Sequence, residues 1–237
     1  MTTYTVHPLP MAKADRPTAT YTYLRNPEER SSVFYGPFLL KSSERNVLVD
    51  TGCDAVHYAA GPLPPINDVA SLEENLGRIE LIIREIDAVV LTHLHFDHTA
   101  FLHLFKQCPK FVQERELRAA RDPHPYFSFF YVPRFFQDVD FEVIDGDRTL
   151  LPGLEVALVA GHSAGSQAVI VETDEGRTAV SGFCCLAKNF ETNNFAIPGI
   201  HESFAKSHDS MLKLLRLADI VYANHSEEAV KLNPTGL

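Results

Sequence analysis

Three histidines and one aspartate lie within six positions of the chain, directly after the short valine-rich run at residues 87–92. Such a run is typical of a strand that is covered on both faces. Because residues two apart in extended chain point to the same side, His93 and His95 can present their imidazoles to one metal ion. Once the chain turns, Asp97 and His98 can face a second ion. Imidazoles packed together without a metal would suffer from desolvation and mutual repulsion, so we favour a metal site over a polar cluster or a surface loop.

The composition is that of a globular protein. Hydrophobic residues make up 45% of the 237 residues and charged residues 22%, which allows a substantial core and excludes disordered, collagen-like and coiled-coil classes. We expect a single domain over residues 1–237. The formal net charge of −10 would repel a phosphate backbone or an anionic membrane surface, so we expect no nucleic-acid and no membrane partner.

Targeting signals and cysteine usage favour a cytoplasmic location. Residues 1–10 lack a basic start followed by an apolar run, and no stretch approaches the roughly 20 apolar residues that span a bilayer. Two of the four cysteines, Cys184 and Cys185, are adjacent and poorly suited to bridging each other. We therefore interpret the cysteines as reduced thiols or metal ligands.

The order of the expected elements indicates an α/β protein. Strands are expected at residues 32–40, 46–50, 87–92, 110–113 and 219–223, with several short strands between 141 and 183. Helices are expected at residues 71–85, 99–107, 114–121 and 203–217, the first with Ser71 as N-cap and Glu74 as its capping-box partner. Two sheets between helical layers would accommodate this order.

Residues 122–138 form an aromatic-rich insertion with three prolines and eight aromatic residues, when His124 is counted. Three interpretations stay open for it: a packed insertion, the contact surface of a homodimer, or a lid over a substrate with an apolar part.

The His-x-His-x-Asp-His motif after a buried strand resembles the signature of the metallo-β-lactamase superfamily. Three further segments resemble that family's pattern in the same order: Val49-Asp50-Thr51-Gly52, Gly161-His162-Ser163-Ala164-Gly165-Ser166 and Ala223-Asn224-His225-Ser226. The last lacks the glycine that usually precedes the final histidine. The resemblance covers roughly residues 33–230 and implies that family's fold, an αββα sandwich of two mixed β-sheets between helical layers.

The resemblance also implies a ligand set. The first metal site would consist of His93, His95 and His162, and the second of Asp97, His98 and His225. Asp50 would fix a ligand imidazole by hydrogen bonding. The cofactor implied is zinc, with two ions per chain, and iron, manganese or cobalt are alternatives.

One expected residue is missing. Members with two metals usually carry a bridging aspartate after a strand that ends in Ser/Thr-Gly, but here Ser181-Gly182 leads into Phe183 and Cys184. Cys184 is the nearest replacement, since thiolate is a good zinc ligand and class B metallo-β-lactamases use a cysteine near this place. An equally favoured interpretation is that Cys184 and Cys185 both act as small buried hydrophobic residues.

Two short segments resemble the N-acyl homoserine lactonase branch of the superfamily: Ile197-Pro198-Gly199-Ile200 and Asn189-Phe190-Glu191. The remaining histidines lack partners at ligand spacing and are expected to be structural or solvated, with His201, beside the first segment, as the best exception. They are His7, His57, His103, His124, His201 and His208.

Our functional hypothesis is a metal-dependent hydrolase that opens a lactone or related cyclic ester by attack of a metal-bound hydroxide. Asp97 would be the catalytic residue that orients the nucleophile and returns its proton to the leaving group. One alternative is hydrolysis of a β-lactam or other cyclic amide with Cys184 in the second site. Another is a di-iron redox protein, which is weakened because the chain has no room for a flavin-binding module beyond residue 230.

Overall fold

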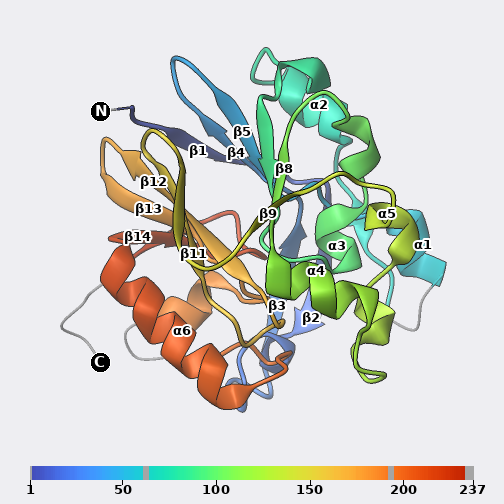
Figure 1. Cartoon of the computed structure of the whole chain (residues 1–237). Coiled ribbons are helices and arrows are strands. Elements are labelled where there is room, and N and C mark those ends of the chain that lie inside the picture. The colour runs from blue at the N-terminus through green and yellow to red at the C-terminus, as the bar shows by residue number, and fades with distance from the viewer. Residues whose placement is uncertain (1, 61–63, 192–194, 233–237) are drawn as a thin grey trace.

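The computed structural model describes residues 2–60, 64–191 and 195–232 (Figure 1). Two six-stranded sheets pack face to face, and helices cover their outer faces, which gives the expected αββα sandwich. Within the described residues, no helix is both long and apolar enough to cross a membrane.

The first sheet has the strand order β1-β4-β5-β7-β8-β9. These strands are β1 (Thr5–Pro8), β4 (Phe38–Lys41), β5 (Asn46–Val49), β7 (Ala88–Val90), β8 (Lys110–Gln113) and β9 (Glu142–Ile144). β5, β7, β8 and β9 run parallel, whereas β1, β4 and β5 pair antiparallel. The parallel strands end at the same edge, and the segment with the three histidines leaves β7 at that edge.

The second sheet has the order β10-β11-β12-β13-β14-β15 and is also mixed. Its strands are β10 (Arg148–Leu151), β11 (Leu154–Leu158), β12 (Gln167–Thr173), β13 (Gly176–Val180), β14 (Ile220–Tyr222) and β15 (Ala229–Lys231).

Both faces of each sheet are buried. Val49 of β5 packs in the core between the sheets with Val169, whereas the next residue back, Leu48, packs on the other face beneath the helices of the first layer. On the second sheet, Met211 and Leu214 of α6 (Phe204–Leu217) pack over its outer face. Strand residues point alternately to the two faces of a sheet, so consecutive valines and leucines pack into the two cores on opposite sides of it.

A third, three-stranded sheet was not expected from the sequence. It consists of β3 (Arg30–Tyr35), β2 (Ala12–Pro17) and β6 (Asn67–Asp68). The single strand expected at residues 32–40 is therefore wrong, because the chain leaves β3 at Gly36-Pro37 and enters the first sheet as β4. A Cβ at Gly36 would lie 2.1 Å from the carbonyl oxygen of Leu9, so the crossing needs glycine.

The helix expected at residues 71–85 is also shorter than expected. α2 spans Leu72–Gly77 and begins with the expected capping box of Ser71 and Glu74. The chain then turns with Glu80 at a φ of +60°, and the N–H of Leu81 donates to the carbonyl of Leu76. The apolar spacing continues beyond this turn because Ile79 and Ile83 still pack against the core.

The remaining helices vary in their agreement with expectation. α4 (Glu114–Arg121) and α6 are confirmed, but residues 99–107 form only the end of α3 (Phe96–Thr99) and the 3-10 turn η3 (Leu102–Leu104). The other short elements are η1 (Thr18–Thr20), α1 (Ala55–Ala60), η2 (Ile83–Glu85), η4 (Ser128–Phe130), α5 (Pro133–Phe136) and η5 (Ala187–Phe190).

Replacing Gly36 with alanine should lower the free energy of unfolding by about 2 kcal/mol, because the new methyl group must displace backbone at Leu9. Gly77→Ala is the matched control: nothing lies within 4 Å of the added Cβ, so its stability should be unchanged or slightly higher. Urea denaturation measures both, and equal stabilities would contradict this account of the crossing.

Candidate metal centre

Five buried histidines and Asp97 converge from three regions of the chain. His93, His95 and His98 follow β7, His162 follows β11, and His225 follows β14. Their potential ligand atoms form two groups, each within 4.8 Å: His93, His95 and His162, and Asp97, His98 and His225. The structure thus brings together the same six residues, in the same two groups, that the sequence motifs indicate.

Backbone carbonyls fix the orientation of two of these rings. Nδ1 of His162 donates to the carbonyl of Ile200 at 2.7 Å, and Nδ1 of His225 donates to the carbonyl of Phe34 at 2.9 Å. A carbonyl only accepts, so Nδ1 must carry the proton in each ring. In the neutral imidazole the lone pair is therefore on Nε2, as a metal ligand requires.

Asp50 orients a third ring and, indirectly, a fourth. Its carboxylate accepts from Nδ1 of His98 at 2.8 Å and from the backbone N–H and hydroxyl of Thr92 at 2.7 and 2.8 Å. Since the Thr92 hydroxyl proton is used on Asp50, its oxygen accepts from Nδ1 of His93 at 2.9 Å. Asn224 donates to both Asp50 and Thr92 and completes this network. Asp50 thus has the orienting position that the sequence motif implies.

Burial and neighbouring charges set the protonation of these rings. Burial lowers the pKa of His93 and His95 well below the ordinary value, and lowers that of His162 and His225 to about 4. At His98 burial acts in the same direction, but the carboxylates of Asp97 and Asp50 outweigh it and raise the pKa to about 9. Four of the rings are therefore neutral near pH 7, which is the protonation state of a ligand.

The arrangement fits divalent metal ions. His93 and His162 bring their Nε2 atoms within 3.1 Å of each other although their protons are on Nδ1, so two lone pairs face one another. Nε2 of His95 and Nε2 of His225 are buried and have no hydrogen-bond partner among the described residues. A cation between such nitrogens would replace repulsion by coordination, and sets of imidazoles with one carboxylate are typical of zinc.

Cys184 has a different position. It lines the same cavity, but within the described residues neither group of potential ligands includes a thiol. Burial raises the pKa of Cys184 well above its usual value and that of Cys185 to about 12. Cys185 contacts the Ser181 hydroxyl, with 3.3 Å between sulfur and oxygen. The second-site role of Cys184 stays a prediction.

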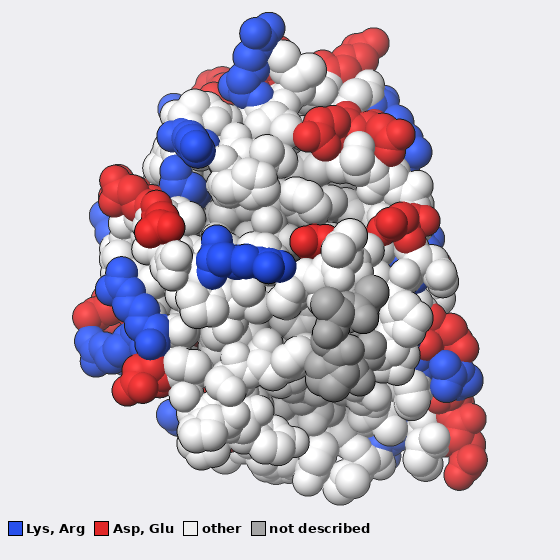
Figure 2. All heavy atoms as spheres, turned by 90° about the vertical axis from the view of Figure 1, so that its right-hand side faces the viewer, with Lys and Arg blue, Asp and Glu red and all other residues white. Residues whose placement is uncertain are grey.

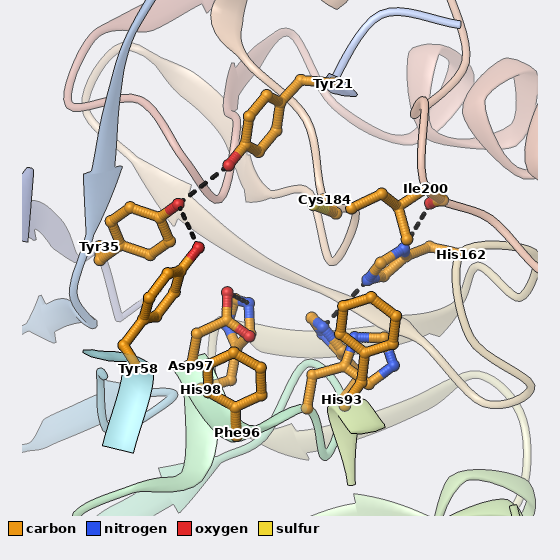
Figure 3. A pocket seen from close by; sticks show the side chains of 12 residues that line it. Tyr21, Tyr35, Tyr58, His93, Phe96, Asp97, His98, His162, Cys184 and Ile200 are labelled. Atoms are coloured by element: carbon orange, nitrogen blue, oxygen red, sulfur yellow. Dashed lines mark hydrogen bonds and ion pairs between the residues drawn. The ribbon is translucent and has the colours of Figure 1, made fainter. Parts of the chain in front are cut away.

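Three tyrosines that sequence reasoning missed form one wall of the cavity (Figure 3). Tyr21, Tyr35 and Tyr58 lie on the Asp97 side, whereas Phe130 and Ile200 belong to its apolar lining. These tyrosines are far apart in the sequence and belong to no recognisable motif, so only the fold brings them together. Of the six histidines that were expected to be structural or solvated, none belongs to either ligand group.

Glu116 was also missed, and it joins three segments of the site. Its fully buried carboxylate accepts from the backbone N–H of Leu94 and from the hydroxyl of Tyr131, at 2.9 and 3.2 Å. It also accepts from the Ser163 hydroxyl at 2.6 Å and from the N–H of Gly165 at 3.0 Å. One side chain thereby holds together three segments: the metal loop (residues 93–98), the His162 loop (residues 161–166) and the aromatic segment (residues 122–138).

Glu116→Gln should destabilise the protein by about 2 kcal/mol, because an amide N–H would face donors where the carboxylate accepts four hydrogen bonds. It should also weaken metal affinity by about tenfold, since the two ligand-bearing loops lose their common anchor. Thermal denaturation and metal titration measure the two effects.

The matched control is Glu114→Gln on the same helix, where an exposed ion pair with Arg118 contributes less than about 0.5 kcal/mol. An effect of Glu116→Gln no larger than this control would contradict the anchoring role.

Comparison with known proteins places this geometry in a family. An N-acyl homoserine lactonase from Bacillus cereus is 28% identical over 214 residues, which is 82% of each chain. The structure of B. thuringiensis AiiA with N-decanoyl-L-homoserine bound superposes with a TM-score of 0.76 at 19% identity, covering 95% of this chain and 94% of that one. A probable metal-dependent hydrolase from Staphylococcus aureus gives a TM-score of 0.79 at 16% identity, with 99% and 94% covered.

The family model of the metallo-beta-lactamase superfamily matches residues 37–223, a range that contains the metal loop, the His162 loop and both cysteines of the adjacent pair. With the sandwich fold and the two ligand groups at the strand ends, this match shows that the chain belongs to the metallo-beta-lactamase superfamily.

Proposed function

We propose that this protein is a metal-dependent hydrolase that opens a lactone or a related cyclic ester. The observation that carries the proposal is the pair of adjoining ligand groups at one cavity, in a chain whose relatives are N-acyl homoserine lactonases. The fold alone would not suffice, since one fold supports many chemistries.

In this proposal His93, His95 and His162 hold one ion, and Asp97, His98 and His225 hold the second. Zinc is the expected metal, and iron, manganese or cobalt would also suit imidazole and carboxylate ligands. When bound, the ions supply an activated water and polarise the ester carbonyl.

Asp97 is the proposed catalytic residue. Its Oδ2 atom lies 3.6 Å from Nε2 of His98 and 3.7 Å from Nε2 of His225, and the side chain lines the cavity. A carboxylate in this position can orient the attacking water, accept its proton and return that proton to the departing alkoxide oxygen. Hydrolysis is then balanced: the ring C–O bond breaks, water supplies the new C–O bond, and its protons end on the products.

The surroundings suit a neutral substrate with an apolar part. Phe130 lines the cavity, and its ring lies against that of His95 with 4.9 Å between centroids. On the face of the molecule that carries α1 and α5, the side chains drawn in white, which are neither basic nor acidic, make up most of the lower central part of Figure 2. Of the three interpretations of the aromatic segment, these contacts favour a wall or lid of the substrate site.

The cyclic-amide alternative is less favoured. It requires Cys184 as a ligand of the second ion, but the thiol lies outside both ligand groups of the described residues. The relatives from Bacillus cereus and Rhizobium rhizogenes are also named as lactonases.

A substrate panel tests the proposal. The zinc-loaded protein should hydrolyse lactones, including N-acyl homoserine lactones, and should act at least about a hundredfold more slowly on β-lactams of similar size; that factor is about 2.7 kcal/mol of transition-state stabilisation. Acid release in a pH-stat measures both reactions. Turnover of β-lactams without turnover of any lactone would reverse our assignment.

Alanine at His95 or His162 should remove one of three ligands of the first group and abolish both metal retention at that site and lactone hydrolysis. Metal content by atomic emission and initial rates measure the two effects. The control is His208→Ala, since the His208 side chain on α6 is 46% exposed and outside both groups. If the His95 and His162 variants retained the wild-type metal content, the ligand assignment would be wrong.

A further inference from the structure

The cavity at the two ligand groups is almost closed. Its volume is about 30 Å³, which is room for about two water molecules and not for a lactone ring. Of the twelve described residues that line it, nine are buried and three are partly exposed: Asp97, Phe130 and Ile200. A substrate must therefore enter beside one of these three side chains, and that side chain must move.

Two of the three side chains are held in place. The carbonyl of Ile200 accepts from Nδ1 of His162 at 2.7 Å, so a shift of this backbone would disturb a metal-ligand ring. The side chain of Ile200 is also β-branched and has few rotamers. Asp97 belongs to the second ligand group. The entrance is therefore expected at Phe130.

The Phe130 ring can leave the cavity without breaking a hydrogen bond, because it has no polar atom. It ends η4 and lies against the ring of His95, with 4.9 Å between centroids and 30° between the ring planes. The other rings it contacts, Phe127 and Phe129, belong to the same turn. It packs on the outside of the core cluster that contains Phe96.

The backbone on both sides of this ring is fixed. The next residue, Tyr131, is buried: its hydroxyl donates to Glu116 at 3.2 Å, and its ring lies 4.9 Å from that of His95. The N–H of Phe130 donates to the carbonyl of Phe127 at 2.9 Å. Opening is therefore the rotation of one side chain to another staggered position, and the aromatic segment around it stays in place.

We propose that Phe130 is the gate of the cavity and a specificity-determining residue that selects substrates by their width. This inference rests on the proposed lactone hydrolysis and narrows its substrate class. Lactones with a narrow, flexible substituent, or with none, pass beside the rotated ring, whereas lactones with a rigid, bulky substituent such as a phenyl group are rejected.

Zinc exchange tests the gate without turnover. Stopped-flow mixing of the metal-free protein with zinc gives the rate constant for binding, and mixing of the zinc-loaded protein with excess chelator gives the rate constant for release. A gate limits entry and exit alike, so Phe130→Ala should raise both rate constants about tenfold and change Kd by less than about twofold. A residue that only supports His95 would change release alone, and with it Kd.

Substrate width tests the selectivity. Phe130→Ala should raise the kcat/KM of γ-phenyl-γ-butyrolactone relative to that of γ-butyrolactone at least about tenfold, because the missing ring no longer restricts the entrance. Phe130→Trp should lower the same ratio. Tyr126→Ala is the matched control: its ring lies in the same segment, is 77% exposed and does not line the cavity, so ratio and zinc rates should stay unchanged.

Unchanged zinc rates in Phe130→Ala, a change in release alone, or an unchanged substrate ratio overturns the inference. If Phe130→Ala does not fold, Phe130→Trp decides: both zinc rates should fall at constant Kd, and wild-type rates would overturn the gate. The proposed function fails separately, since no hydrolysis of either lactone would count against lactone hydrolysis while the zinc rates still test Phe130.

Discussion

The repulsion between converging imidazole nitrogens is the constraint on which this structure depends. Protons on Nδ1 are held by the carbonyls of Ile200 and Phe34, by Asp50 and by Thr92, which leaves lone pairs directed at a common interior. Without a bound cation, burying these rings together would cost free energy, because their ring nitrogens would have no partner. The surrounding sheets and loops hold these rings in place, and their hydrogen bonds orient the ring nitrogens for metal binding.

That framework uses both sheets. The first supplies the metal loop at the end of β7, and the second supplies His162 after β11 and His225 after β14. Separate loops are linked by buried polar contacts: Asp50 and Asn224 join the two sheets, and Glu116 joins the metal loop to the His162 loop. These contacts are costly to break because each buried group would lose its partners in an interior that excludes water.

The fold class, and the place of residues 93–98 directly after a buried strand, could be predicted from the sequence alone, and the physical reasons are local. His93, His95 and His98 lie within six residues, directly after a recognisable buried strand. The cap at Ser71 depends only on Glu74, three positions away. His162 and His225 were found only through the family pattern, since neither segment has a metal signature of its own.

What sequence reasoning missed is non-local. The apolar periodicity of residues 71–85 continues through a turn because Ile79 and Ile83 reach the core from non-helical backbone. Glu116 stands in a run of charged residues typical of a solvated helix face, and only the packing of two loops against α4 buries it. The grouping of Tyr21, Tyr35 and Tyr58 at the cavity, and the break between β3 and β4 at Gly36, likewise depend on contacts across the fold. The spacing of residues in the sequence does not indicate such contacts.

We expect two metal ions to bind between the six ligand residues. Anomalous diffraction from a zinc-loaded crystal at the zinc edge would locate them. We predict two peaks, one about 2.1 Å from a nitrogen of His93, His95 and His162 and the other at a similar distance from Asp97, His98 and His225. A map without a peak at this cavity, or with peaks bound by other residues only, would contradict the account.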